Sequence, residues 1–231
     1  MKRILTAALL SILAVAAGGC NDNGSGFGVS NQARVRAVNA APDAATLKVS
    51  VGGNTIGDNL SYTQATDYKT VDSGEQEVVV ETVVGQQKII DQQSAFTAGA
   101  DYTMLVVGAG SDVTLLNITD DNATPPSGQA KFRVIDAIPG APVSFDVYFT
   151  PPGTDLTTAT PSLTNLTTGT ASSYAALAAG TYQVQITQAG SKTVLVDGGT
   201  VTLNAGDIRT AVLLAAPGGG TPYSAVLLTG G

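Results

Sequence analysis

An internal repeat restricts the fold of this chain more than any other feature of its sequence. The segment "ARVRAVNAAPDA" (33–44) returns without a gap as "AKFRVIDAIPGA" (130–141). Three further segments return in the same order, with 47–51 matching 145–149, 65–82 matching 171–188, and 97–108 matching 204–215. Because four segments keep their order, the sequence predicts a duplicated domain.

Within each copy, short runs rich in Val, Ile, Thr and Tyr are separated by Gly, Pro and Asn, a pattern typical of strands and turns. The strands expected in the first copy are 33–38, 47–51, 67–71, 77–84, 87–91, 102–107 and 113–118. Those expected in the second are 130–135, 144–149, 173–177, 181–187, 192–196, 208–215 and 223–228. About seven strands per copy predict an all-β chain of two tandem Ig-like β-sandwich domains, 33–118 and 130–231, joined by a linker at 119–129.

Several of the repeated motifs also occur in a known family. The stretches "VRAVNAAPDAATLKVSV", "AAGTYQVQI" and "LNAGDIRTAVLLA" together resemble the DUF4397 family, and the resemblance covers both copies. It implies secreted or envelope proteins with an Ig-like sandwich and no assigned activity. Family members often carry His just before the first turn, where this chain has Asn39 and Asp136. No role for that histidine can therefore be carried over.

The repeated turn has a physical explanation. Pro42 and Pro139 fix the backbone angle φ between the first two strands of each copy. Asn39 and Asp136 are expected to accept a hydrogen bond from the backbone amide two residues ahead. Asp43 has Gly140 as its counterpart, so a side-chain contact at that position is not essential to the fold.

The first twenty residues indicate how the protein is held in place. Lys2 and Arg3 precede an apolar stretch at 4–15, small residues follow, and Cys20 is the only cysteine. This arrangement resembles a bacterial lipoprotein signal, which implies cleavage after residue 19 and acylation of the thiol and amine of Cys20. The membrane would then be a partner through those acyl chains, and 20–32 would be a flexible tether. The alternative is an incidental thiol beside an ordinary secretory cleavage site.

Location follows from the same segment. Asn21 stands after the cysteine in place of an Asp that resembles an inner-membrane retention signal, which favours the outer membrane of a bacterial cell envelope. Whether the domains face the periplasm or the cell surface is left open.

Composition excludes several functional classes. Removal of residues 1–19 leaves nine of the 11 basic residues against all 18 acidic ones, and such a surface repels nucleic acid. The chain has no histidine, which excludes Ser-His-Asp triads and the usual zinc ligand sets. A serine–lysine pair is not excluded, but no motif places one. We therefore expect no catalytic residues, no cofactor and no enzyme activity.

One acidic segment offers oxygen ligands. Asp120, Asp121 and Asn122 lie together in the expected linker, and oxygen ligands suit Ca²⁺. The segment lacks the spaced acidic residues of a calcium loop, so a solvated linker is the favoured interpretation. We expect no metal site.

The copies differ most at 150–169, which is Thr- and Pro-rich with spaced leucines. Loops on a rigid sandwich often carry recognition, so Leu156, Leu163 and Leu166 are the expected apolar anchors of a partner-binding loop. A solvated insertion is the alternative.

The sequence as a whole predicts a non-catalytic, lipid-anchored envelope protein with a structural or interaction role, towards an unidentified envelope or extracellular protein or polymer. The alternative function is a module that binds a polymer such as a glycan, or a small ligand, through loops at one sandwich end.

Overall fold

The computed structural model describes residues 31–140 and 144–231, and within them every regular element is a β-strand. Helices able to span a membrane are absent from these described residues. The predicted signal peptide (1–19), Cys20 and most of the predicted tether lie outside them. In the described part of the chain, sixteen strands form four sheets of four strands each.

The first domain contains two of these sheets. One has the order β4-β1-β7-β8 and the other the order β3-β2-β5-β6. Their bounds are β1 (Gln32–Asn39), β2 (Leu47–Val51), β3 (Asn54–Leu60), β4 (Lys69–Asp72), β5 (Gly74–Thr82), β6 (Lys88–Phe96), β7 (Asp101–Val107) and β8 (Thr114–Asp120). Strands β1 and β7 run parallel, and every other pair in this domain is antiparallel.

The second domain repeats this topology. Its sheets have the orders β12-β9-β15-β16 and β11-β10-β13-β14, with β9 and β15 parallel. Their bounds are β9 (Gln129–Asp136), β10 (Phe145–Thr150), β11 (Leu163–Leu166), β12 (Ala175–Ala178), β13 (Gly180–Gln188), β14 (Val194–Leu203), β15 (Ile208–Leu214) and β16 (Ser224–Thr229). The chain therefore consists of two tandem β-sandwich domains, as the repeat predicted.

Each domain has its own apolar core between its two sheets. On β1, Ala33, Val35 and Ala37 face this core, because successive side chains of a strand point to opposite faces. Phe132 and Val134 on β9 do the same in the second domain. The intervening side chains of β1 and β9 point the other way, towards the other domain.

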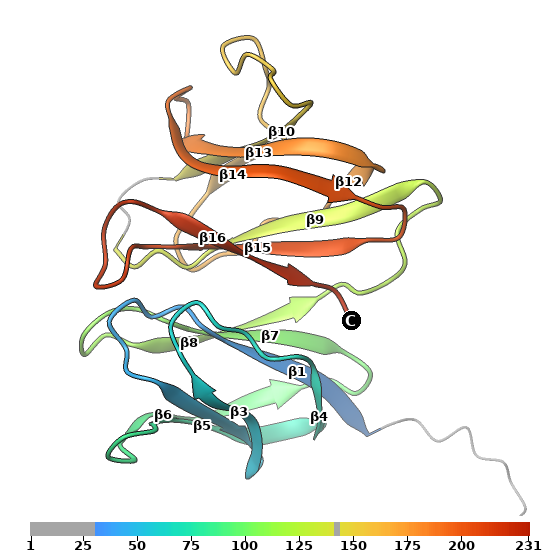
Figure 1. Cartoon of the computed structure of the whole chain (residues 1–231). Coiled ribbons are helices and arrows are strands. Elements are labelled where there is room, and N and C mark those ends of the chain that lie inside the picture. Colours follow the sequence, from blue (N-terminus) through green and yellow to red (C-terminus); the bar gives the residue numbers. More distant parts are fainter. Residues whose placement is uncertain (1–30, 141–143) are drawn as a thin grey trace, which may run out of the picture.

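The four sheets lie in a stack, in which the β1 sheet of the first domain faces the β9 sheet of the second (Figure 1). Strand β7 is buried at all seven positions, and β9 at seven of eight. An ordinary sandwich strand would be exposed on alternate positions. The outer faces of these two sheets are therefore covered, and the domains are joined by more than their linker.

Two strands were not predicted from the sequence, so the described residues of each domain form eight strands rather than about seven. Strand β3 is "NTIGDNL" and β11 is "LTNL", and neither is rich in β-branched or aromatic residues. Both pair irregularly with their neighbour, and Asn59 and Asn165 have positive φ angles of 55° and 56°. These polar segments are strands because their backbones pair with β2 and β10, and the strand propensity of their own residues does not predict such pairing. Strand β8 also continues through Asp120, so the connection to β9 begins later than residue 119.

Candidate functional site

The surface shared by the β1 and β9 sheets, here called the interdomain interface, is the most distinctive feature of the molecule. Its apolar part is a third core, to which both domains contribute. The contributing buried residues are Val38, Ala40, Leu105 and Val107 from the first domain and Ile135, Ala137, Val212, Leu214 and Leu228 from the second. Burial of this apolar area favours association of the two domains.

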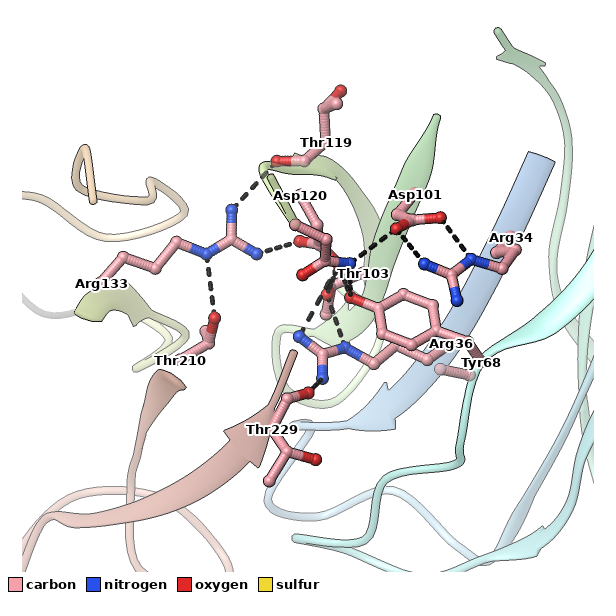
Figure 2. A network of polar contacts seen from close by, with 12 residues as sticks. Arg34, Arg36, Tyr68, Asp101, Thr103, Thr119, Asp120, Arg133, Thr210 and Thr229 are labelled. Atoms are coloured by element: carbon pink, nitrogen blue, oxygen red, sulfur yellow. Dashed lines mark hydrogen bonds and ion pairs between the residues drawn. The ribbon is translucent and has the colours of Figure 1, made fainter. Parts of the chain in front are cut away.

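Two arginines at equivalent positions lie at the polar end of the interface (Figure 2). Arg36 and Arg133 are 3% and 2% exposed. Each donates from Nε to a threonine of the parallel neighbouring strand, Arg36 to Thr103 at 2.8 Å and Arg133 to Thr210 at 3.1 Å. The threonines hold the guanidinium groups so that the Nη1 atom of each arginine points into the other domain.

The Nη1 contacts cross the interface in both directions. Arg36 Nη1 donates to the carbonyl oxygen of Thr229 in the second domain at 2.5 Å. Arg133 Nη1 donates to the carbonyl oxygen of Thr119 in the first domain at 3.0 Å. Thr119 and Thr229 occupy equivalent places in β8 and β16, because Thr103 pairs with Ile118 and Thr210 with Leu228. The exchange is thus reciprocal, as in a two-fold symmetric dimer interface.

Each arginine also lies against a tyrosine of its own domain. The guanidinium of Arg36 is 4.7 Å from the ring centre of Tyr68, and that of Arg133 is 4.8 Å from the ring centre of Tyr174. These distances fit cation–π contacts. Burial raises the pKa of both tyrosines, so their hydroxyl groups stay neutral.

A single carboxylate breaks this symmetry. Asp120, whose side chain is fully buried, forms ion pairs with Arg133 and, at 3.7 Å, with Arg36. It also accepts hydrogen bonds from the hydroxyl groups of Thr103 and Tyr68. The equivalent position in the second domain is Gly230, where an added Cβ would lie 2.6 Å from Ile208 Cβ. The second domain therefore has no room for a matching side chain, and one carboxylate serves two arginines.

Two further ion pairs surround this network. Arg34 binds Asp101 through two hydrogen bonds, of 2.7 and 2.5 Å. Burial alone would raise the pKa of Asp101, but the hydrogen bonds from Arg34 and Asn122 outweigh it and lower that pKa. The Lys131 amine lies 2.8 Å from the Asp121 carboxylate and lowers its pKa.

These contacts bear on the calcium hypothesis. The carboxylates of Asp120 and Asp121 are bound by arginine and lysine, respectively, rather than turned towards a common point. Among the described residues, moreover, no group of three or more acidic, histidine or cysteine side chains is placed to hold a metal ion.

A cavity of about 500 Å³ lies at another part of the seam between the domains. The first domain contributes the segment around Val107 and Leu116, and the second contributes Pro139, Gly169 and Gly220. Its walls are mainly apolar, and Asp112 is the one charged side chain among them. Pockets at domain interfaces are common positions for small-molecule binding.

The predicted turns are confirmed. The amide of Ala41 donates to Asn39 Oδ1 at 3.2 Å, and the amide of Ile138 donates to Asp136 Oδ1 at 3.0 Å. Asp43 accepts from the amide of Gly110 at 2.7 Å, a contact that Gly140 cannot make. Asn39 and Asp136 are both fully buried.

The expected partner-binding loop is folded against its own domain. Leu156 and Leu166 are 7% and 5% exposed, and Leu163 is half-buried against the second core. Leu166 belongs to β11, which pairs with β10. Leu163 and Leu166 pack with the core of the second domain, and Leu156 is buried as well. Side chains buried in this way do not fit the prediction that they are the apolar anchors of a partner-binding loop.

The interdomain interface was not predicted from the sequence, although the sequence contains a signal for it. Arg34 and Arg36 alternate with core residues on β1, and Lys131 and Arg133 do the same on β9. Basic residues at matching positions of both copies, on the face opposite each core, indicate a second shared face. Asp120, by contrast, could not have been distinguished from a linker residue.

Comparison with known proteins gives a family without a function. Among curated proteins, none matches the chain. A leucine-rich repeat protein from Bacteroides thetaiotaomicron VPI-5482 aligns over 81% of this chain and 27% of its own, with 16% identity and a TM-score of 0.23. The carbohydrate-binding module CBMbc (family CBM26) from Eubacterium rectale Amy13K, solved with maltoheptaose, aligns over 85% and 96%, with 8% identity and a TM-score of 0.25. Both TM-scores are too low to support any conclusion about function.

The family comparison is decisive. The model described as "Domain of unknown function (DUF4397)" matches residues 33–148 and 133–229. These two matches correspond to the two copies in the sequence and together span both sandwiches. The chain therefore belongs to the DUF4397 family, of which it carries two tandem copies.

Proposed function

We propose that this protein is a non-catalytic, lipid-anchored protein of the bacterial cell envelope, with a structural or protein-interaction role, in which the two domains act as one rigid body. The observation that carries the rigid-body part of this proposal is the reciprocal hydrogen bonding of Arg36 and Arg133 across the interdomain interface. Burial of charge is costly unless every charged group is paired. The two arginines and the carboxylate are paired only while the domains stay in this arrangement, which supports a fixed rather than a flexible pair of domains.

A rigid pair holds its outer surfaces at a fixed separation. Stacked sheets pack about 10 Å apart, so the two outermost sheets of four are about 30 Å apart. A partner bound at one outer sheet would thus be kept at a defined distance from anything bound at the other. This property suits a spacer or an assembly platform better than a catalyst.

The anchor is the second part of the proposal. Acylation of Cys20 would give two or more acyl chains, which is what stable membrane attachment requires. The polar, glycine-rich residues that follow would separate the rigid pair from the bilayer, which we propose to be the outer membrane.

Cell fractionation with a matched variant tests the anchor. The wild-type protein should sediment with membranes and incorporate a labelled fatty acid, while Cys20→Ala should do neither. Protease treatment of intact cells then distinguishes the two faces, since digestion places the domains outside and protection places them in the periplasm. Wild-type protein that is soluble and unlabelled would contradict the proposed attachment.

The cavity favours a second candidate function, that of a binding module for a small ligand. Its mainly apolar walls, with Asp112 as the one charged group, suit an uncharged or cationic molecule with an apolar body. A thermal-shift screen of sugars and small amines would test this, with Ala109→Trp as the variant that fills the cavity. A ligand that stabilises both proteins equally does not bind in the cavity.

A further inference from the structure

Asp136 of the second domain differs from the equivalent Asn39 of the first domain in how its side chain is hydrogen-bonded. It is the last residue of β9, and its side chain is fully buried. One carboxyl oxygen, Oδ1, accepts the Ile138 amide. The other, Oδ2, accepts no hydrogen bond of ordinary geometry from the described residues, although the Thr168 side chain lies close enough to the carboxyl group to act on its pKa. A buried polar atom without a partner is costly.

In the first domain Asn39 occupies the same place and is fully satisfied. Its Oδ1 accepts the Ala41 amide, and its Nδ2 donates to the carbonyl oxygen of Leu60 at 3.1 Å. The surrounding backbone is the same in both copies. Thr63 N donates to Asn39 O at 2.9 Å, and Gly169 N donates to Asp136 O at 2.8 Å.

Register identifies the acceptor that corresponds to the Leu60 carbonyl. Leu60 pairs with Leu47 at the start of β2, and Leu166 pairs with Phe145 at the start of β10. The Leu166 carbonyl therefore stands where the Leu60 carbonyl stands. An ionised carboxylate can only accept hydrogen bonds, so it cannot bind the Leu166 carbonyl, whereas a neutral carboxylic acid can donate one through its O–H group.

The electrostatic surroundings agree with a neutral acid. Burial raises the pKa of Asp136 to about 6, although hydrogen bonds from the Ile138 amide and the Thr168 side chain act to lower it. None of the causes of this shift is a charged group.

The charged side chains of the neighbouring strands are engaged elsewhere. On β9, Lys131 binds Asp121 and Arg133 binds Asp120. On β15, Arg209 binds Asp207. On β10, Asp146 accepts the backbone amides of Asn165 and Gly190.

We propose that Asp136 is a pH-sensitive contact of the second domain, which as the neutral acid donates a hydrogen bond to the Leu166 carbonyl and on ionisation loses it. The segments tied by this contact, 136–140 and 166–170, include Pro139, Thr168 and Gly169, which line the cavity at the domain seam. Ionisation would therefore loosen one wall of that cavity while the first domain, with Asn39, is unaffected. This inference does not depend on the proposed function.

Exchange of the two residues tests the proposal on the folded two-domain protein. Thermal unfolding would be followed from pH 4.5 to 7.5 in the wild type, in Asp136→Asn and in Asn39→Asp. The wild-type melting temperature should fall by roughly 5–10 °C over this range, because the folded state binds the proton more tightly than the unfolded state. Asp136→Asn should lack that fall, and Asn39→Asp should add a second one.

A direct titration keeps the test decisive if Asn39→Asp does not fold. The carboxyl carbon of Asp136, followed by NMR in the wild type, should titrate near pH 6, and the Gly169 amide should lose protection from hydrogen exchange above that pH. A midpoint near 4, or a wild-type pH dependence retained in Asp136→Asn, would overturn the proposal.

Discussion

Arg36 and Arg133 lie at equivalent positions of the two domains, and each donates a hydrogen bond to the equivalent threonine carbonyl of the other domain, at 2.5 and 3.0 Å. This reciprocity is the property of a two-fold interface between identical subunits. Here it occurs within one chain, between the products of a duplication, and Asp120 on one side has Gly230 on the other. The duplicated faces have thus kept a symmetric geometry and acquired an asymmetric charge distribution.

Asp120 should matter more to stability than either of its arginines. Asp120→Asn leaves two buried guanidinium groups without a counter-charge and should lower the free energy of unfolding by about 3–5 kcal/mol. Arg133→Met should cost less, because Asp120 keeps its ion pair with Arg36. Chemical denaturation of both variants at pH 7 measures the difference. Equal costs, or a larger cost for Arg133→Met, would contradict a shared carboxylate.

The apolar part of the interface can be disrupted without touching either domain core. Leu105 is fully buried, and it packs in the third core rather than in the core of the first domain. Leu105→Asp places an unpaired charge there and should separate the domains while each sandwich stays folded. Small-angle scattering would show a larger radius of gyration with unchanged circular dichroism. Val84→Asp, at a position 85% exposed, is the matched control and should change neither.

Asp101 should contribute to stability with the opposite pH dependence to Asp136. Its pKa in the folded protein lies below the ordinary value of 3.8. The stabilisation is therefore present above about pH 4 and is lost as the pH falls through the folded pKa. Because the Arg34 side chain is 45% exposed, the effect should be on the order of 1 kcal/mol. Asp101→Asn should lower stability at pH 7 and flatten the decline below pH 4, as measured by urea unfolding across that range.

Leu166 should behave as a core residue. Leu166→Ala removes a buried side chain beside β10 and should cost about 2–4 kcal/mol in the free energy of unfolding. Leu163→Ala, at a half-buried position of the same strand, should cost less. Urea unfolding of the two variants distinguishes core packing from the prediction of a partner-binding loop, under which both substitutions would leave stability nearly unchanged.

The sequence was informative wherever local pattern decides structure. Alternation in "ARVRAV" and "AKFRVI" predicted β1 and β9. The turns at Asn39 and Asp136 were predictable because these side chains can accept a hydrogen bond from the amide two residues ahead. Strands β3 and β11 were missed because their pairing, rather than their composition, makes them strands. The ion pair of Asp120 with Arg133 could not be predicted either, because Arg133 comes from the other domain and only the stacking of the sheets brings the two together.

The claim that the two domains form one rigid body is tested most directly by measuring the distance between the two outer sheets and the width of its distribution. Gln93 and Thr200 are exposed residues at equivalent places on β6 and β14. Because Cys20 is the only cysteine of the chain, a mature protein with Cys20→Ala can be spin-labelled at Gln93→Cys and Thr200→Cys alone. The account predicts one narrow distance distribution, with a width set by the labels, that broadens when Leu105→Asp is added. A broad distribution in the protein with an intact interface would contradict the claim that the two domains form one rigid body.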